Sequence, residues 1–151
     1  MALTEVDAAR LNDNVFNTVG PFKNRIINGD MRIDQRNAGA SVTMNSSSTT
    51  AYCVDRFEAR VQQASAAMTV QQSTTAPAGF TNSLLHTVTN TTAPGSGNRV
   101  HTRQIIEGFN VADLGWGASG ALTVTLSFWV RSSVIGTYGV GFINDAENRS
   151  Y

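Results

Sequence analysis

The chain has 151 residues, which is enough for one domain with a hydrophobic core. Lys and Arg together number 11, and so do Asp and Glu, so the formal net charge is zero and we expect no nucleic-acid binding. Charged residues make up only 15% of the chain, which is typical of secreted or virion β proteins. The single cysteine, Cys53, excludes an internal disulfide and a Cys-rich metal site. It lies in an apolar run, so we expect it to be buried.

Residues 1–20 form a predicted N-terminal arm that ends at the Gly20-Pro21 dipeptide. The segment lacks the basic and apolar regions of a signal peptide. No apolar run approaches the ~20 residues that span a bilayer, so we expect no membrane insertion. The short apolar stripe of the arm cannot support an isolated helix, and we expect the arm to need a partner. Its candidate docking residues are Leu3, Val6, Leu11, Val15 and Phe16.

Residues 21–151 form the predicted β domain, because the apolar residues now alternate with polar ones. Residues 27–34 alternate in this way and predict a strand with one buried face. Asn28-Gly29 could form a tight turn, but the alternation carried through it favours a bulge or bend within the strand. Residues 44–50 are predicted to form a loop that is too polar to pack.

Further elements follow in order along the chain. We predict strands over residues 52–61, 67–72, 83–89 and 100–107, a turn over residues 90–98, and a short helical turn over residues 109–114 that closes at Gly115. Residues 121–131 give the strongest strand prediction, because every even position from 122 to 130 is apolar, and residues 137–143 predict a last strand. Short strands separated by turns predict a mainly β fold, an antiparallel β-sandwich.

Four segments in order resemble the jelly-roll module of phage tail-fibre and other virion proteins. Residues 24–36, NRIINGDMRIDQR, are similar to its opening strand, which carries Asn-Gly and ends in Gln-Arg. The other three are residues 54–57 (VDRF), 104–108 (QIIEG) and 126–133 (LSFWVRSS). The resemblance covers residues 24–151 and leaves out only the arm.

The resemblance implies a carbohydrate-binding-module-like, jelly-roll β-sandwich on a phage appendage that is commonly a homotrimer. We therefore expect a structural virion protein, the N-terminal part of a tail fibre. It would be assembled in the host cytoplasm, be located in the virion tail and serve host attachment. The arm would dock onto tail tube, adaptor or nozzle proteins. A capsid decoration or head-fibre protein and a glycan- or receptor-binding module are the alternatives.

The end of the sequence departs from that module, which normally continues with further strands past residues 148–151. Either the β domain is truncated at its C-terminal end or another chain completes its sheet. We favour truncation.

Residue types that carry catalysis are sparse, and we expect no enzyme, no cofactor and no metal site. His86 and His101 stand outside metal-binding motifs, and two imidazoles without a third ligand make a poor site. Asp30 and Asp34, on one predicted strand face, would lie roughly 13 Å apart, too far for a glycosidase pair.

Two other groups keep alternatives open. Asp55 and Glu107 could meet only in three dimensions, and we interpret Asp55-Arg56 as a structural ion pair or turn contact. Trp116, flanked by glycines in a predicted loop, is the candidate glycan contact because loops carry binding more often than strands. Core or subunit packing is the competing interpretation for Trp116 and for Trp129.

Overall fold

Six strands and one short helix are found in the part of the chain that the computed structural model describes, residues 23–45, 49–62, 67–90 and 99–150. The fold is therefore mainly β, as predicted. The predicted arm lies outside the described residues, with all five docking candidates, and so does most of the predicted turn over residues 90–98. The elements are β1 (Val42–Asn45), β2 (Thr49–Val54), β3 (Phe57–Gln62), β4 (Ala67–Ser73), β5 (Ser83–Asn90), β6 (Arg99–Gln104) and the 3₁₀ helix η2 (Gly108–Leu114).

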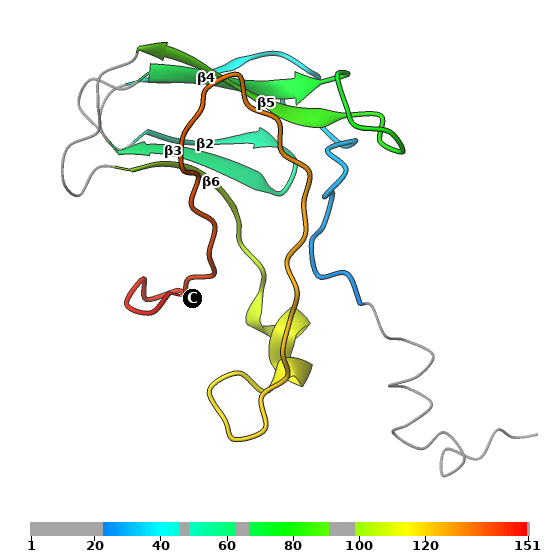
Figure 1. Cartoon of the computed structure of the whole chain (residues 1–151), viewed down its shortest axis with the longest axis vertical. Helices are drawn as coiled ribbons and strands as arrows, with labels where there is room; N and C mark the ends of the chain where they lie inside the picture. Colours follow the sequence, from blue (N-terminus) through cyan, green and yellow to red (C-terminus); the bar gives the residue numbers. More distant parts are fainter. Residues whose placement is uncertain (1–22, 46–48, 63–66, 91–98, 151) are drawn as a thin grey trace, which may run out of the picture.

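The strands form two antiparallel three-stranded sheets, with the orders β1-β4-β5 and β2-β3-β6. Figure 1 shows them as two layers, with η2 beyond one end. At the centre of the first sheet, Val70 of β4 lies opposite Val42 of β1 and His86 of β5. At the centre of the second, Val61 of β3 lies opposite Val100 of β6. Partners in such pairs point to the same face of the sheet, so the register defines which side chains face the other layer.

The hydrophobic core lies between the two sheets and is built from both. Cys53 is fully buried in it, as predicted, and burial raises the pKa of its thiol. Met44 is also fully buried and pairs with Met68, so the prediction of a polar loop from residue 44 is wrong. Met44 and Val42 lie on one face of β1, opposite Met68 and Val70 of β4, so the strand begins before the polar residues and includes Asn45. The core residues are Met44, Cys53, Ala59, Val61, Met68 and Val70.

The predicted strand over residues 27–34 is wrong, and so is the predicted bulge within it. The chain turns there, with the Met31 N–H donating to the Asn28 carbonyl at 2.9 Å. Asn28 and Met31 both have a φ of 56°, which a strand does not accommodate. The Asn28 side chain bonds both backbone groups of Ile33, each at 2.9 Å. Local side-chain bonding of this kind competes with sheet formation.

The predicted strand over residues 52–61 is instead a hairpin. β2 and β3 meet at the two-residue turn Asp55-Arg56, with Val54 opposite Phe57. Arg56 has a φ of 75°, in the left-handed region that tight turns use. Asp55-Arg56 is therefore a turn contact, and Arg56 forms its ion pair with Glu107.

Other sequence predictions are confirmed. β4 and β5 match the predicted strands over residues 67–72 and 83–89, and η2 matches the predicted helical turn. The helix ends at Gly115, which caps it with a φ of 61°. The predicted strand over residues 100–107 is right for its first part, but β6 ends at Gln104.

The segment before β1 is tied to η2 by an ion pair. The Arg25 guanidinium donates to the Asp113 carboxylate through two nitrogens, one of them at 2.7 Å. Lys23 lies 4.0 Å from the same carboxylate. These cations lower the pKa of Asp113 to about 2, chiefly through the hydrogen bonds from Arg25.

The predicted strands over residues 121–131 and 137–143 are wrong. Residues 121–142 form no strand pairing with any described residue. Figure 1 shows this stretch as a trace that runs from η2 to the level of the β1-β4-β5 sheet and back. Most of its large apolar side chains stay exposed, and Phe128 keeps 59% of its surface accessible. Beyond it, Ile143 and Ser150 form an isolated antiparallel bridge.

One side of the core is closed and the other is open. On the β1 and β2 side, Met44 and Cys53 are fully buried. On the β5 and β6 side, the register turns Val88 and Val100 toward the opposite layer, since they pair with the core residues Met68 and Val61. Val88 is nevertheless 61% exposed and Val100 46% exposed.

Candidate functional site

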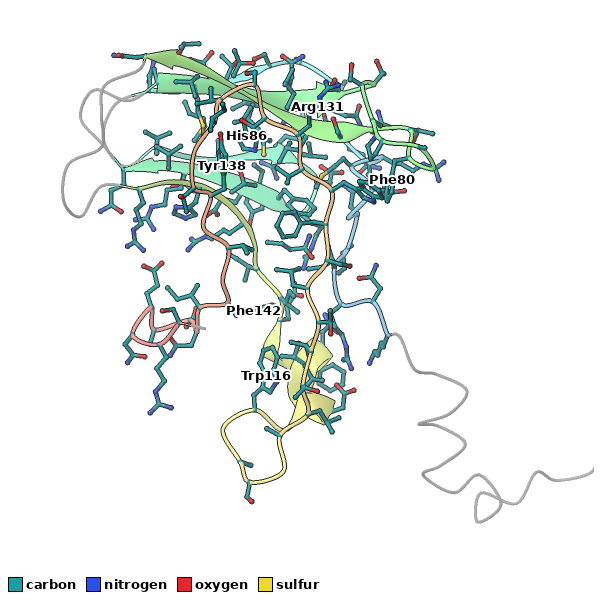
Figure 2. All side chains as sticks on the ribbon, viewed as in Figure 1. Phe80, His86, Trp116, Arg131, Tyr138 and Phe142 are labelled. Carbon is teal, nitrogen blue, oxygen red and sulfur yellow. The ribbon has the colours of Figure 1, made fainter. Side chains whose placement is uncertain are left out.

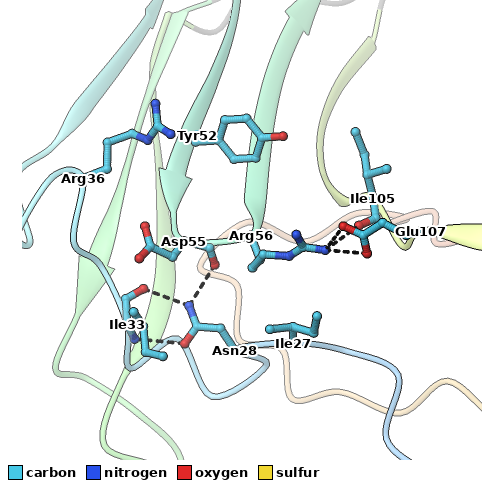
Figure 3. Close-up of a pocket in the computed structure, with 9 residues that line it drawn as sticks. All are labelled: Ile27, Asn28, Ile33, Arg36, Tyr52, Asp55, Arg56, Ile105 and Glu107. Atoms are coloured by element: carbon cyan, nitrogen blue, oxygen red, sulfur yellow. Dashed lines mark hydrogen bonds and ion pairs between the residues drawn. The ribbon is translucent and has the colours of Figure 1, made fainter. Parts of the chain in front are cut away.

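A hollow of about 500 Å³ lies beside the Asp55-Arg56 turn. Figure 3 shows the residues around it, which come from the turn segment after residue 26, from β2 and from the chain leading into η2. Apolar and charged side chains are mixed in its wall, and the Arg36 guanidinium lies 5.3 Å from the centre of the Tyr52 ring. The lining residues are Ile27, Asn28, Ile33, Arg36, Tyr52, Asp55, Arg56, Ile105 and Glu107.

An ion pair between Arg56 and Glu107 forms one wall of the hollow. Nη2 of Arg56 donates to both Glu107 carboxylate oxygens, at 2.8 and 2.9 Å (Figure 3). The hairpin turn supplies the arginine, and the residue before η2 supplies the carboxylate. This hydrogen bonding lowers the pKa of the Glu107 carboxyl. The Arg56 Nε is buried and has no hydrogen-bond partner among the described residues.

Asn28 closes the opposite wall. Its Nδ2 donates to the carbonyls of Ile33 and Asp55, each at 2.9 Å. The Asp55 N–H in turn donates to the Ile33 carbonyl at 3.2 Å. These bonds attach the turn at residues 27–31 to the hairpin turn beside the hollow.

Asp55 and Glu107 do line one hollow, which their separation in the sequence left open. Asp55 Oδ2 accepts the Gln35 N–H at 3.2 Å, and Glu107 is paired with Arg56. A general acid needs a carboxyl that is protonated near the working pH, and the lowered pKa of Glu107 moves it away from that state.

Asp30 and Asp34, which were predicted to lie too far apart for a glycosidase pair, each contact neighbouring groups of the turn segments before β1. Asp34 accepts the N–H groups of Asn37 and Gly39, at 3.1 and 2.7 Å, and holds the turn that precedes β1. Asp30 lies 3.8 Å from Arg32. The two carboxylates do not share a strand face, because residues 27–34 form no strand.

The two histidines belong to different sheets, and His86 lies on an inner face while His101 lies on an outer face. His86 pairs with Val70 and faces the other layer, where its Nε2 lies 3.2 Å from the Thr102 hydroxyl. His101 pairs with Arg60 on the outer face of the second sheet. Burial and three neighbouring arginines lower the pKa of His101. Within the described residues, no three His, Cys, Asp or Glu side chains are grouped closely enough to hold a metal ion.

Trp116, the candidate glycan contact, lies in the loop after η2 and is 49% exposed. Its ring packs edge-on against Phe142, with centroids 6.0 Å apart. Its indole N–H donates to the Leu122 carbonyl at 3.1 Å. Figure 2 shows Trp116 and Phe142 at the η2 end of the molecule, away from the sheets. Trp116 thus holds the ends of the 121–142 segment near η2 while half of its surface stays accessible.

A charged cluster on the outer face of the second sheet was not predicted from the sequence. Arg60 of β3 and Arg99 and Arg103 of β6 surround the carboxylate of Glu147. The signal was present as the period-two spacing of residues 99, 101 and 103, which places all three on one strand face. The acidic member could not be found in this way, since Glu147 comes from the hairpin at residues 143–150.

Comparison of the chain with protein-family models, with curated proteins and with solved structures gave no match. None of the helices in the described ranges is long and apolar enough to cross a membrane.

Proposed function

We propose that this chain is a structural subunit of a virion appendage, the N-terminal part of a phage tail fibre that docks to the tail and starts the fibre without catalysis. The observation that carries the proposal is the open side of the core together with the unpaired apolar segment 121–142. A surface of this kind needs a partner, because large exposed apolar patches on soluble proteins mark interaction sites.

The partner in this proposal is a second and a third copy of the chain. The zero net charge supports self-association, because copies of the chain do not repel one another through their overall charge. Residues 122–130 alternate in the pattern of a strand, and β5 and β6 are outer strands of their sheets among the described residues. We therefore assign a jelly-roll sandwich to the assembled fibre, in which the exposed apolar segment 121–142 of one copy covers the open side of another.

The N-terminal arm attaches the fibre to tail tube, adaptor or nozzle proteins in this proposal, and the virion tail is the location. Support comes from the narrow apolar stripe of residues 1–20 and from the four segments that resemble tail-fibre modules. A capsid decoration or head-fibre protein is the alternative within the same structural class.

Deletion of residues 1–19 tests the docking. Virions assembled with the full chain should retain it through purification, whereas the deletion variant should fold and stay in the soluble fraction. The circular dichroism spectrum of the variant serves as the folding control. Retention of the deletion variant in purified virions would rule out docking through the arm, and a virion map that places the chain on the head would support the decoration alternative.

Glycan or receptor binding is the second candidate function, and the half-exposed indole of Trp116 favours it. A glycan array probed with the full chain and with the Trp116→Ala variant tests it. Binding that the substitution abolishes would support this function. Equal binding by both proteins would remove Trp116 from it.

A further inference from the structure

The outer face of the β2-β3-β6 sheet carries a concentrated set of cations. The register places Arg60 opposite His101, and Arg99 and Arg103 lie one row away on either side. The three arginines and His101 lie on the face opposite the core. They alternate along the strands with the buried residues Ala59 and Val61 of β3 and with the β6 residues that pair with these two. The outer sheet face thus presents three guanidinium groups in neighbouring rows.

One carboxylate from a separate hairpin occupies the centre of this cluster. Glu147 Oε1 lies 3.1 Å from Arg103 and 3.7 Å from Arg60, and its Oε2 lies 3.1 Å from Arg99. Glu147 reaches this point with a φ of 50°, a conformation that non-glycine residues rarely adopt. The position of the Glu147 side chain shows where these three arginines hold a carboxylate group.

Glu147 does not saturate the cluster. Three guanidinium groups face two carboxylates, and the second, Glu58, is engaged by Arg103 Nε at 2.8 Å. The Arg60 Nε is buried without a hydrogen-bond partner among the described residues, which leaves a donor unsatisfied. Arginine is the side chain best suited to bind carboxylates through paired N–H groups.

An aromatic side chain lies on the same face. Tyr52 pairs with Glu58, which pairs with Arg103, so the three residues form one row across the sheet. The Tyr52 side chain is accessible, and Arg36 adds a further cation above its ring. The row thus places Arg103, whose Nε is paired with Glu58, beside a partly accessible ring, and together with Arg36 these groups suit a sugar ring that carries an acid group.

We propose that the outer face of the β2-β3-β6 sheet binds a carboxylate-bearing polysaccharide through Arg60, Arg99 and Arg103, and that Glu147 occupies this site until the polysaccharide displaces it. The sugar ring lies against Tyr52. This site is separate from Trp116, and it does not depend on the assembly proposed above.

Calorimetric titration of the full chain with polygalacturonate at low ionic strength tests the proposal. Wild type should bind saturably, and neutral dextran should give no heat of binding. Glu147→Gln should bind about fivefold more tightly, because the internal competitor is lost. Arg99→Gln should weaken binding by about fivefold, while Arg32→Gln, which removes the same charge at an exposed site away from the cluster, should leave it unchanged. Arg103 is left intact because its loss would leave Glu58 buried without its partner.

Several results would overturn the proposed binding of an acidic polysaccharide to this face. No saturable binding by either wild type or Glu147→Gln overturns the proposal, and so does equal weakening by Arg99→Gln and Arg32→Gln. If Glu147→Gln binds no better than wild type, then Glu147 is not the competitor. Polyglutamate that binds as tightly as polygalacturonate would assign the face to acidic protein segments. A rise in the melting temperature of wild type with polygalacturonate gives a readout that does not depend on any variant folding.

Discussion

The Asn28 side chain forms hydrogen bonds with three backbone groups. Its Oδ1 accepts the N–H of Ile33, and its Nδ2 donates to the carbonyls of Ile33 and Asp55. The left-handed backbone of Asn28 and its amide together turn a strand-like sequence into a turn that supports the hairpin. Sequence periodicity carries no information about such bonds, so it predicted a strand here. The Asn-Gly dipeptide was the one local signal of a turn, and the turn actually forms from Asn28 to Met31.

The Asn28→Ala variant tests this role of the side chain. Loss of its hydrogen bonds and the strain of a left-handed alanine should lower the free energy of unfolding by about 3 kcal/mol. Asn28→Gly loses the same hydrogen bonds but keeps an easy left-handed backbone, so its loss should be smaller. Urea denaturation of both variants measures the difference. An alanine variant as stable as the glycine variant would show that the backbone conformation contributes little.

Asp113 gives the described chain a stability term that depends on pH. Its pKa is about 2 in the fold, against an ordinary value of 3.8, because Arg25 stabilises the ionised form. A lowered pKa stabilises the fold above the ordinary value, and this stabilisation is lost as the pH falls from near 4 toward 2. Wild type should therefore lose melting temperature in this window.

The Asp113→Asn variant should lose less melting temperature than wild type between pH 5 and pH 2, and Arg25→Gln should behave in the same way. The double variant should match either single variant, since both remove one interaction. Thermal denaturation followed by circular dichroism measures all four proteins. An unchanged pH dependence in both single variants would contradict the role of this ion pair.

At the scale of elements, predictions from sequence succeeded where the determinants are local. β4, β5 and η2 follow from alternation and from a glycine cap within the segment itself. The hairpin of β2 and β3 was missed because its turn residues, Asp55 and Arg56, interrupt the apolar alternation only slightly. The stretch 121–131 has strong alternation, but it pairs with none of the described strands, although β5 and β6 are outer strands of their sheets. Alternation fixes which side chains share a face, and it cannot supply the partner.

Both candidate sites join residues that are far apart in the sequence. The hollow beside Asp55-Arg56 joins residues 27 to 107, and the cluster around Glu147 joins residues 60 to 147. Contacts over such separations depend on how strands, turns and the 143–150 hairpin are placed relative to one another, and the pattern within any one segment does not give that placement. The sequence pointed to Asp55, Glu107 and Trp116 as residues of interest, and only the fold relates them to their neighbours.

One substitution in the core and one on the surface separate the effects on folding stability from the effects on self-association. Val61→Ala removes two buried carbons beside Met44 and should lower the free energy of unfolding by about 2 kcal/mol. Phe128→Ser changes an exposed side chain and should leave the unfolding of the isolated chain almost unchanged while weakening self-association. Chemical denaturation and gel filtration measure the two effects. A Phe128→Ser protein that unfolds as readily as Val61→Ala would contradict the exposed position of Phe128.

At the scale of the whole molecule, two three-stranded sheets enclose a hydrophobic core. The core-facing side chains are buried along β1 and β2, whereas Val88 of β5 and Val100 of β6 stay exposed to solvent. The same chain carries a strand-patterned apolar segment that pairs with no described residue. A protein with both features is suited to assembly, and the proposed appendage subunit uses the segment to complete a sandwich between copies.

Sedimentation equilibrium of the full chain tests that assembly most directly. A homotrimer should sediment with three times the monomer mass of 16.1 kDa, and Phe128→Ser should shift the protein toward the monomer. A wild-type chain that remains a monodisperse monomer across the accessible concentration range would contradict the proposed assembly.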